Sequence, residues 1–355
     1  MRRLLSILLL FSAFGLLGRG HVGCEAFPAQ PRCFVALHPG PAQDALTAVF
    51  IRGARTYASA GELLLTTVAV DPDLAAAEWV RHLWSPRVRL VARTELYPPG
   101  DDTDEVRRRN VAEMDRSQVA AAVAALRTLG HAVDLAPDGA RVVEVVAGSP
   151  AEATLALGDV IVSVDGDPVH TADAATQHVR DRAPGDVVSL RIRRDGDLRT
   201  VTVRLAPHID DPDRPLVGAL LTDHLSLPVD VRIEAGQVGG PSAGLMFALA
   251  VIDALTAKDL TGGAVIAGTG VIDEHGVVGA IGGIQQKILG AVHRDDDRGA
   301  SAFLVPRGNL DEARSTRVGR EILVIPVGTL QEALDALEQL RGGRRPPDAV
   351  ALGRS

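Results

Sequence analysis

The sequence predicts a multidomain protein of the α+β or α/β class behind a short apolar N-terminal segment. The chain has 355 residues, which is enough for two or three domains. Hydrophobic residues make up 46% of it and aromatic residues only 3%, so the core must consist of aliphatic side chains. Strand-like and helix-like stretches follow one another, separated by turns rich in glycine and proline. This composition is typical of folded domains and excludes a disordered chain.

The charge balance excludes one class of partner. The formal net charge is −8 and no basic stretch with interleaved aromatic residues occurs, so no nucleic-acid surface is expected. Of the 37 basic residues only two are lysines, Lys258 and Lys287. A lysine in such a chain is a candidate for a role that arginine cannot fill.

The N-terminus has the pattern of an export signal. Arg2 and Arg3 precede an apolar run at 4–17, and Arg19 ends it. The run is short for a spanning helix, which needs about 17–25 residues. A cleaved signal peptide, a retained anchor and lipidation at Cys24 all fit the pattern. The positive-inside rule places the bulk of the chain on the extracytoplasmic side of the cell membrane, as a single-pass or tethered protein.

The cysteine content agrees with export. Cys24 and Cys33 are the only two cysteines, and both follow the apolar run. One nearby pair in an exported chain suggests a disulfide that closes a small loop. Two unpaired thiols are the alternative.

Shifts in composition divide the chain into five segments. They are a signal peptide or membrane anchor, a mixed α/β region, a β-rich domain, a second mixed domain and a flexible tail, at residues 1–20, 21–125, 126–208, 216–341 and 342–355. The mixed α/β region is expected to contain a turn at 34–46, a strand at 61–70, a helix at 73–84, a polar loop at 97–110 and a helix at 113–130.

The β-rich domain combines short strands with tight turns. The expected elements are strands at 140–146 and 158–169, a short helix within 147–157, a helix at 171–185 and a hairpin at 186–205. Asp195-Gly196 is the expected hairpin turn. The motifs "GSPA" and "GDVIVSVDGDPV", followed by a helix and a hairpin, resemble a bacterial PDZ domain over about 80 residues.

The PDZ resemblance implies a peptide-binding function. Such domains add an extended peptide C-terminus as a strand at a sheet edge. Leu129-Gly130 is the expected carboxylate-binding loop. The alternative is a domain that only packs against its neighbour.

The second mixed domain follows a linker rich in proline and aspartate. The expected elements are strands at 229–236, 300–306 and 321–327, short strands with glycine turns over 262–284, and helices at 245–255, 284–293 and 329–340. Thr329 is the expected N-cap of the last helix. Strands and helices alternate, so an α+β or α/β fold is predicted.

One serine stands at the start of an apolar run. In "VGGPSAGLMFALAVIDAL", the Gly-Gly-Pro sequence lets the backbone turn into a helix. The helix at 245–255 is apolar on every side and is expected to be buried. Ser242 therefore lies at a helix N-terminus, where free N–H groups and the helix dipole can stabilise an oxyanion. A helix-start serine without chemistry is the alternative.

Lys287 favours the catalytic interpretation of Ser242 over the structural one. In "IQQKILGAV", Ile284, Ile288 and Ala291 share one helical face, and Lys287 lies on the same face. Burial of an ammonium group lowers its pKa, and a lysine with a pKa near neutral is a usable general base. Arginine cannot serve as such a base. For Lys258, a favourable interaction of its positive charge with a helix C-terminus is a sufficient explanation.

These motifs together resemble a known family. "GGPSAGL", "GTGVIDEHGVVGAIGGIQQKILGA" and "FLVP" resemble the proteolytic domain of Lon-type serine peptidases over 216–341. The resemblance implies a serine endopeptidase with Ser242 as nucleophile, Lys287 as base and Thr269 as a support for the lysine. With the apolar segment, "HPGP" and the PDZ-like domain, the whole chain resembles the membrane-anchored, PDZ-containing Lon-like proteases.

The resemblance also implies partners and energy use. Expected substrates are exported or membrane polypeptides, bound or regulated through the PDZ domain, and Lon-type domains often form homo-oligomeric rings. Two departures matter. The ATP-dependent members carry an acidic residue where this chain has Gly239, and no "GxxxxGK[ST]" occurs here. The chain is therefore expected to use no ATP in cis, no other cofactor and no metal.

Two other functions fit parts of the sequence. "GPSAG" also matches the nucleophile elbow of α/β-hydrolases, with His275 or His293 as base and Asp253 or Asp273 to orient it. A PDZ-like domain stands where the first half of a hydrolase sheet would be required, which disfavours this interpretation. The second alternative is a non-catalytic membrane scaffold, and the presence of both Ser242 and Lys287 argues against it.

Overall fold

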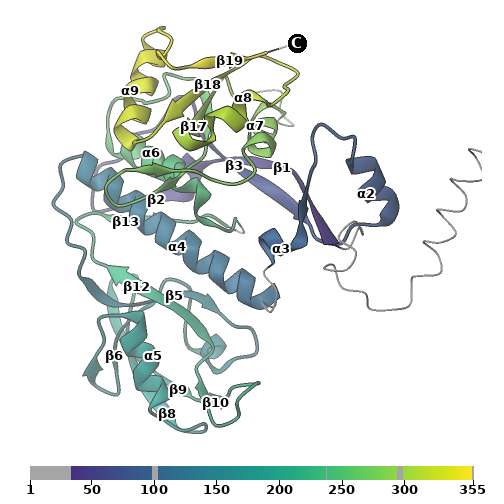
Figure 1. Cartoon of the computed structure of the whole chain (residues 1–355). Coiled ribbons are helices and arrows are strands. Elements are labelled where there is room, and N and C mark those ends of the chain that lie inside the picture. The colour runs from purple at the N-terminus through teal and green to yellow at the C-terminus, as the bar shows by residue number, and fades with distance from the viewer. Residues whose placement is uncertain (1–32, 98–102, 237, 294–298, 354–355) are drawn as a thin grey trace, which may run out of the picture. The chain divides into compact units, whose positions relative to one another are not determined.

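The structure is a computed structural model that describes residues 33–97, 103–236, 238–293 and 299–353. The described chain forms two compact units (Figure 1). The smaller unit contains residues 33–38 and 70–97, and the larger unit contains residues 39–69 and those from 103 onward.

The smaller unit is built on the ends of two strands that continue into the larger one. Its elements are parts of β1 (Phe34–Asp44) and β3 (Glu62–Asp71), with α2 (Ala76–His82), β4 (Arg89–Ala92) and α3 (Arg93–Leu96). Strand β4 pairs antiparallel with β1, Phe34 opposite Ala92. Cys33 is disulfide-bonded, and Cys24 lies outside the described residues.

The turn predicted at 34–46 is wrong, because β1 runs through it as a strand. Val35, Ala36 and Leu37 ahead of the prolines are buried, and this burial outweighs the turn propensity of "HPGP". Proline is tolerated in a strand where its missing N–H would not face a partner.

The larger unit is centred on a mostly parallel sheet. The order of its strands is β19-β18-β17-β14-β3-β1. The new strands are β14 (Val265–Gly268), β17 (Ala302–Pro306), β18 (Ile322–Val327) and β19 (Val350–Leu352). Strands β3, β14, β17 and β18 are mutually parallel, and β19 is antiparallel to β18. The tail predicted as flexible at 342–355 therefore contains a paired strand.

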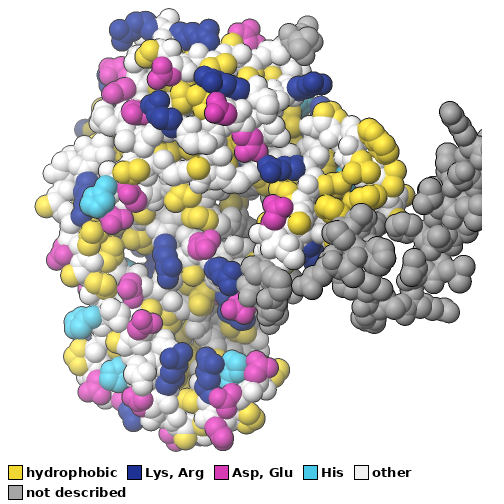
Figure 2. All heavy atoms as spheres, in the orientation of Figure 1, with side chains coloured by type: hydrophobic (Ala, Val, Ile, Leu, Met, Phe, Trp, Pro, Cys, Tyr) yellow, Lys and Arg dark blue, Asp and Glu magenta, His cyan; other side chains and the backbone are white. Residues whose placement is uncertain are grey.

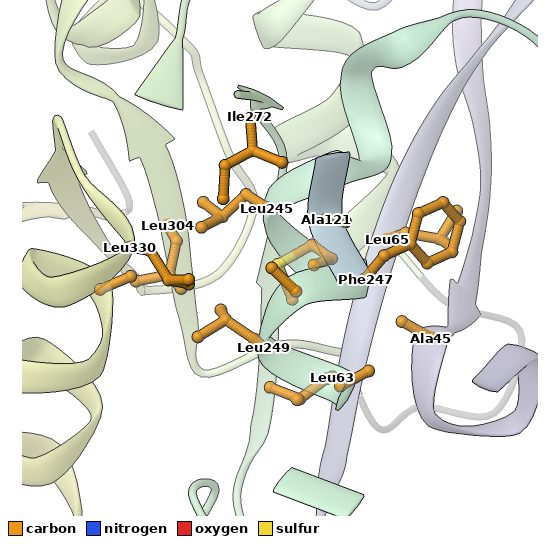
Figure 3. Close-up of a cluster of buried hydrophobic side chains, with 14 of the residues drawn as sticks. Ala45, Leu63, Leu65, Ala121, Leu245, Phe247, Leu249, Ile272, Leu304 and Leu330 are labelled. Atoms are coloured by element: carbon orange, nitrogen blue, oxygen red, sulfur yellow. The ribbon is translucent and has the colours of Figure 1, made fainter. Parts of the chain in front are cut away.

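Helices cover both faces of this sheet. The new helices are α4 (Thr103–Thr128), α6 (Gly244–Leu255), α7 (Ile284–Val292), α8 (Leu310–Arg314) and α9 (Leu330–Arg341). Leu63 and Leu65 of β3 share a core with α4, α6 and α9, whereas Leu64 belongs to a second core with α7. Since alternate strand residues point to opposite faces, α6 and α7 lie on opposite sides. Figure 3 shows the first core around α6, whose burial confirms the prediction.

A second sheet forms its own module. Its strands are β5 (Pro137–Val145), β6 (Val160–Val164), β8 (Val187–Arg194), β9 (Asp197–Arg204) and β12 (Ala219–Leu225), in the order β12-β5-β6-β8-β9. Helix α5 (Ala172–Arg180) packs on this sheet over a separate core. The predicted hairpin turn is confirmed, since Asp195 and Gly196 have positive φ values of 54° and 91°.

The structure differs from the sequence prediction at two domain boundaries. Residues 39–69 and 103–128 share a core with 243–337, so 21–125 is not a region of its own. Strand β12 lies within the predicted domain 216–341, yet it pairs with β5 along its whole length. The β-rich module is therefore an insertion between α4 and β13 (Asp230–Ile233), and β13 pairs with β2 (Val49–Arg52).

The remaining elements are short. They are η2 (Ala45–Ala48), η3 (Pro150–Ala153), β7 (Asp167–Pro168), β10 (Ala206–Pro207), β11 (Pro215–Leu216), η4 (Pro241–Ala243), β15 (Val271–Ile272), β16 (Val278–Gly279) and η5 (Arg307–Asn309). Within the described ranges, no helix combines the length and the apolar character needed to cross a bilayer.

The shared core can be tested by two leucine truncations. Leu65→Ala and Leu249→Ala are each expected to lower the free energy of unfolding by about 2–5 kcal/mol, because both side chains are fully buried in one core. Urea unfolding followed by circular dichroism measures this. Leu157→Ala is the control, since that side chain is 65% exposed. The shared core would be contradicted if Leu65→Ala unfolded in two separate transitions, with the first at a lower urea concentration, while Leu249→Ala unfolded in one.

Candidate active site

Ser242 lies in a tight turn that leads into α6. The turn is the 3-10 segment η4 (Pro241–Ala243), which directly precedes the α-helix. Ser242 therefore lies at the N-terminal end of α6, as the sequence predicted, in the turn that directly precedes the helix. Gly240 adopts φ 80° and ψ 158°, a conformation open essentially to glycine alone. This glycine lets the chain reverse sharply into the serine.

The backbone of Ser242 is fixed from the sheet side. Its carbonyl oxygen accepts two hydrogen bonds, from Thr269 Oγ1 at 2.9 Å and from the Gly270 N–H at 2.8 Å. The N–H of Leu245 in turn donates to the Gly270 carbonyl at 3.1 Å. The segment after β14 and the start of α6 are thereby joined.

Helix α4 holds the same turn from another direction. Ser117 Oγ donates to the Pro241 carbonyl at 2.8 Å, and the Gly240 N–H donates to the Asn110 carbonyl at 3.3 Å. Ser117 is itself buried. The serine turn is thus hydrogen-bonded to two separate parts of the fold, so its geometry is set before any ligand binds.

Lys287 reaches Ser242 from α7. Its Nζ lies 2.8 Å from Ser242 Oγ and donates to the Thr66 carbonyl, also at 2.8 Å. The residue is only 4% exposed, which confirms the predicted burial. The side chain of the other lysine, Lys258, is 62% exposed and pairs with Glu338. The two lysines therefore differ in environment as the sequence indicated.

Burial changes the acid–base character of Lys287. Loss of hydration disfavours the ammonium form and lowers the pKa from 10.5 to about 8. At pH 8 about half of the Lys287 side chains are consequently neutral, and a neutral amine can accept a proton.

The pair lies where a parallel strand ends. Strand β14 stops at Gly268, opposite Leu65 of β3, and Thr66 continues beyond that point. The carboxyl ends of parallel strands are the usual binding position in α/β sheets. Because α6 and α7 lie on opposite faces of the sheet, the turn before α6 and a side chain of α7 can meet past the end of β14.

Sequence reasoning located some of these residues and missed others. Thr269 was expected to support Lys287, but its hydroxyl binds the carbonyl oxygen of Ser242. The acceptor for the lysine is the Thr66 carbonyl, and Ser117 belongs to a helix assigned to another region. A backbone acceptor leaves no signal in a sequence, so Thr66 could not have been found there.

The alternative hydrolase residues have other partners. Asp273 Oδ1 accepts the N–H groups of His275 and Val277, and Asp253 Oδ1 accepts that of Leu260. The His275 side chain is 70% exposed. His293 caps the end of α7. Ser242 Oγ is bonded to Lys287, which disfavours the Ser-His-Asp interpretation.

A buried ionic cluster joins the inserted module to α4. Asp115 of α4 forms an ion pair with Arg141 of β5 and accepts a 2.5 Å hydrogen bond from Thr222 Oγ1 of β12. Burial, and secondarily the charge of Arg232, lowers the pKa of Arg141 to about 10. Asp115 and Ser117 are two residues apart, so one helix contacts both the second sheet and the serine turn.

Two family models match the chain. Residues 127–205 match the PDZ domain, and residues 222–339 match the Lon protease C-terminal proteolytic domain. The crystal structure of the PDZ domain of an SdrC-like protein from Listeria monocytogenes matches at 25% identity, covering 25% of this chain and 93% of that chain, with a TM-score of 0.23.

Similar proteins include named proteases. Lon protease 2 of Herpetosiphon aurantiacus is 37% identical over 112 residues, which are 30% of this chain and 13% of that protein. Lon protease of Clostridioides difficile is 43% identical over 89 residues, 24% of this chain and 10% of that protein. Serine protease PepD of Mycobacterium tuberculosis is 45% identical over 69 residues, 19% of this chain and 15% of that protein.

The match therefore covers at most 15% of the length of any of these three relatives. The expected resemblances are confirmed at the level of the two domains. The chain contains a PDZ domain followed by a Lon-type C-terminal proteolytic domain, which is a serine peptidase domain.

Proposed function

We propose that this protein is a serine endopeptidase with a Ser-Lys catalytic dyad. The observation that carries the proposal is the 2.8 Å separation of Ser242 Oγ and Lys287 Nζ, with the lysine buried. A nucleophile within hydrogen-bond reach of an adjacent base, which a third group orients, is the arrangement that covalent catalysis requires. Here the orienting group is the Thr66 carbonyl.

The mechanism is acyl transfer. Neutral Lys287 takes the hydroxyl proton as Ser242 Oγ attacks the carbonyl carbon of a peptide bond. The resulting ammonium then protonates the leaving amine, and the C–N bond breaks to give an acyl-enzyme. Water, deprotonated by Lys287, attacks the ester, and the proton returns to Ser242 as the acid product leaves.

The oxyanion needs hydrogen-bond donors close to the nucleophile. The N–H groups of Gly244 and Leu245 already donate to the carbonyls of Pro241 and Gly270. The backbone N–H groups of Ser242 and Ala243, at the start of the turn, are therefore the proposed donors. Backbone donors fixed in advance stabilise such charge without reorganisation.

The PDZ domain is proposed to bind polypeptide substrates. Strand β12 is an edge of its sheet, and α5 lies beside it, with the Ala172 N–H bonded to Asp223 Oδ1 at 2.8 Å. An extended peptide C-terminus would add along β12, the usual mode of these domains. Strand β12 is also close to Ser242 in the sequence, because the chain runs from β12 through β13 into η4.

The proposed location is the cell membrane, with the described chain on the extracytoplasmic side. The support is the basic start, the apolar run at 4–17 and the disulfide at Cys33, which fits an oxidising compartment. Substrates would then be exported or membrane proteins. With no phosphate-binding loop in the sequence, hydrolysis is proposed to need no ATP in cis.

Replacement of the base tests the dyad. Lys287→Arg is expected to lower kcat/KM on an unfolded protein or peptide substrate by about 10²–10⁴-fold or more, because guanidinium remains protonated. Lys258→Arg is the matched control, since that lysine is exposed and paired, and it should retain full activity. Ser242→Ala should be as inactive as Lys287→Arg. Activity of folded Lys287→Arg within about tenfold of the wild type would rule out Lys287 as the base.

The pH profile gives a second test. Since the neutral form of Lys287 is the base and its pKa is about 8, kcat/KM should rise about tenfold per pH unit up to roughly pH 8 and level off above about pH 9. A peptide substrate without ionisable groups near the scissile bond isolates the enzyme's titration. A midpoint near 6.5 would indicate histidine instead, and a flat profile from pH 6 to 9 would refute a titrating base.

Amide exchange tests the peptide site. In the Ser242→Ala protein, a peptide with a free apolar C-terminus is expected to slow hydrogen–deuterium exchange in β12, because strand addition pairs its backbone. Strand β9, the opposite edge of the same sheet, is the internal control. The same peptide with an amidated C-terminus should bind weakly. If the peptide does not slow exchange in β12, the domain does not bind peptides there and only packs against its neighbour.

A further inference from the structure

Helix α2 of the smaller unit has two apolar faces, and among the described residues only one of them has ring contacts with a neighbouring element. On the packed face, the rings of Trp79 and Phe34 lie 6.0 Å apart, and those of His82 and His38 lie 5.2 Å apart. These contacts fasten the helix to β1. They account for one side of α2 and leave the other to solvent.

The second face exposes large apolar side chains. Val80 is 44% exposed, Leu83 51% and Trp84 77%. Their spacing of three and four residues places them on one side of the last helical turn and the two residues that follow it. We call these three residues the α2 apolar face. Figure 2 shows hydrophobic side chains gathered over this part of the smaller unit.

Single exposed apolar residues are normal, but a contiguous group marks an interaction site. The protein has only two tryptophans, and one of them is left almost fully exposed here. Tryptophan is enriched at membrane–water interfaces, where its ring lies among the headgroups.

The course of the chain indicates what covers the face. The described part of the smaller unit begins at Cys33, and the apolar run at 4–17 precedes it in the sequence. Fifteen residues separate that run from Cys33, a reach of at most about 55 Å when fully extended. If the run is held in a bilayer, the smaller unit stays close to the lipid surface.

We infer that the α2 apolar face inserts into the interfacial layer of a lipid bilayer, as a second membrane contact besides the N-terminal segment. The inference rests on the membrane location proposed above and is independent of the catalytic proposal. Val80, Leu83 and Trp84 enter the headgroup–acyl boundary, and exposed Arg81 stays at the headgroup level.

The two tryptophans allow a direct test in the full chain. The protein is reconstituted in phosphatidylcholine–phosphatidylglycerol vesicles with or without lipids brominated on the acyl chains, which quench nearby tryptophan. In Trp79→Phe the emission comes from Trp84 alone, and it should shift to shorter wavelength and lose intensity in brominated vesicles. In Trp84→Phe the emission comes from Trp79, and it should show little quenching. If Trp79→Phe does not fold, the difference between wild type and Trp84→Phe reports on Trp84.

The possible results separate the alternatives. Quenched Trp84 supports the inference. A blue shift without quenching means that protein covers the face, either the N-terminal segment or a second copy of the chain, and overturns it; sedimentation then distinguishes those two. Unshifted, unquenched Trp84 in a vesicle-bound chain also overturns it. A chain that does not bind vesicles refutes the inference together with the membrane location. Peptidase assays on the same samples report separately on the catalytic proposal.

Discussion

The contact between the Lys287 amine and the Ser242 hydroxyl imposes the strictest constraint on this fold. It requires an ammonium group to lose most of its hydration, and the fold meets that requirement by surrounding the lysine with aliphatic side chains of α7 and the sheet. It also requires the turn that leads into α6 and the side chain of a residue in α7 to meet, although these two helices lie on opposite faces of the sheet. That is feasible only where β14 ends, so strand length, helix placement and the glycine-rich turn all follow from one contact.

Local sequence signals were sufficient for the two central residues and insufficient for what surrounds them. Ser242 is marked by a Gly-Gly-Pro turn before a wholly apolar helix, and Lys287 by its place on an apolar face in a chain rich in arginine. Both signals are short-range. Strand β1 passes through a sequence typical of a turn, and β12 and β19 are defined by pairing with distant strands. Such pairing depends on tertiary contacts that propensity does not encode.

The inserted position of the PDZ domain changes how its relation to the peptidase domain is understood. In the sequence it looks like a module placed ahead of a second module. In the fold, the chain leaves the core of the larger unit to form the PDZ domain and then returns to the same core. The buried Asp115 binds residues of both β5 and β12. The helix that carries Asp115 also carries Ser117, which holds the turn at Pro241. The two domains are thus linked through contacts of α4 as well as by the chain.

Thr66 and Lys287 are 221 positions apart, and the PDZ domain lies between them. A polypeptide that began after the PDZ domain would keep the serine and the lysine, but it would lack β3 and α4. It would lose the acceptor that orients the amine and one of the two supports of the serine turn. Gene fission or an internal start site at that boundary would therefore yield a fragment with Ser242 and Lys287 but without the Thr66 acceptor and the Ser117 support. Duplication or loss of the PDZ domain in evolution has to occur within an intact host, by an exchange between α4 and β13.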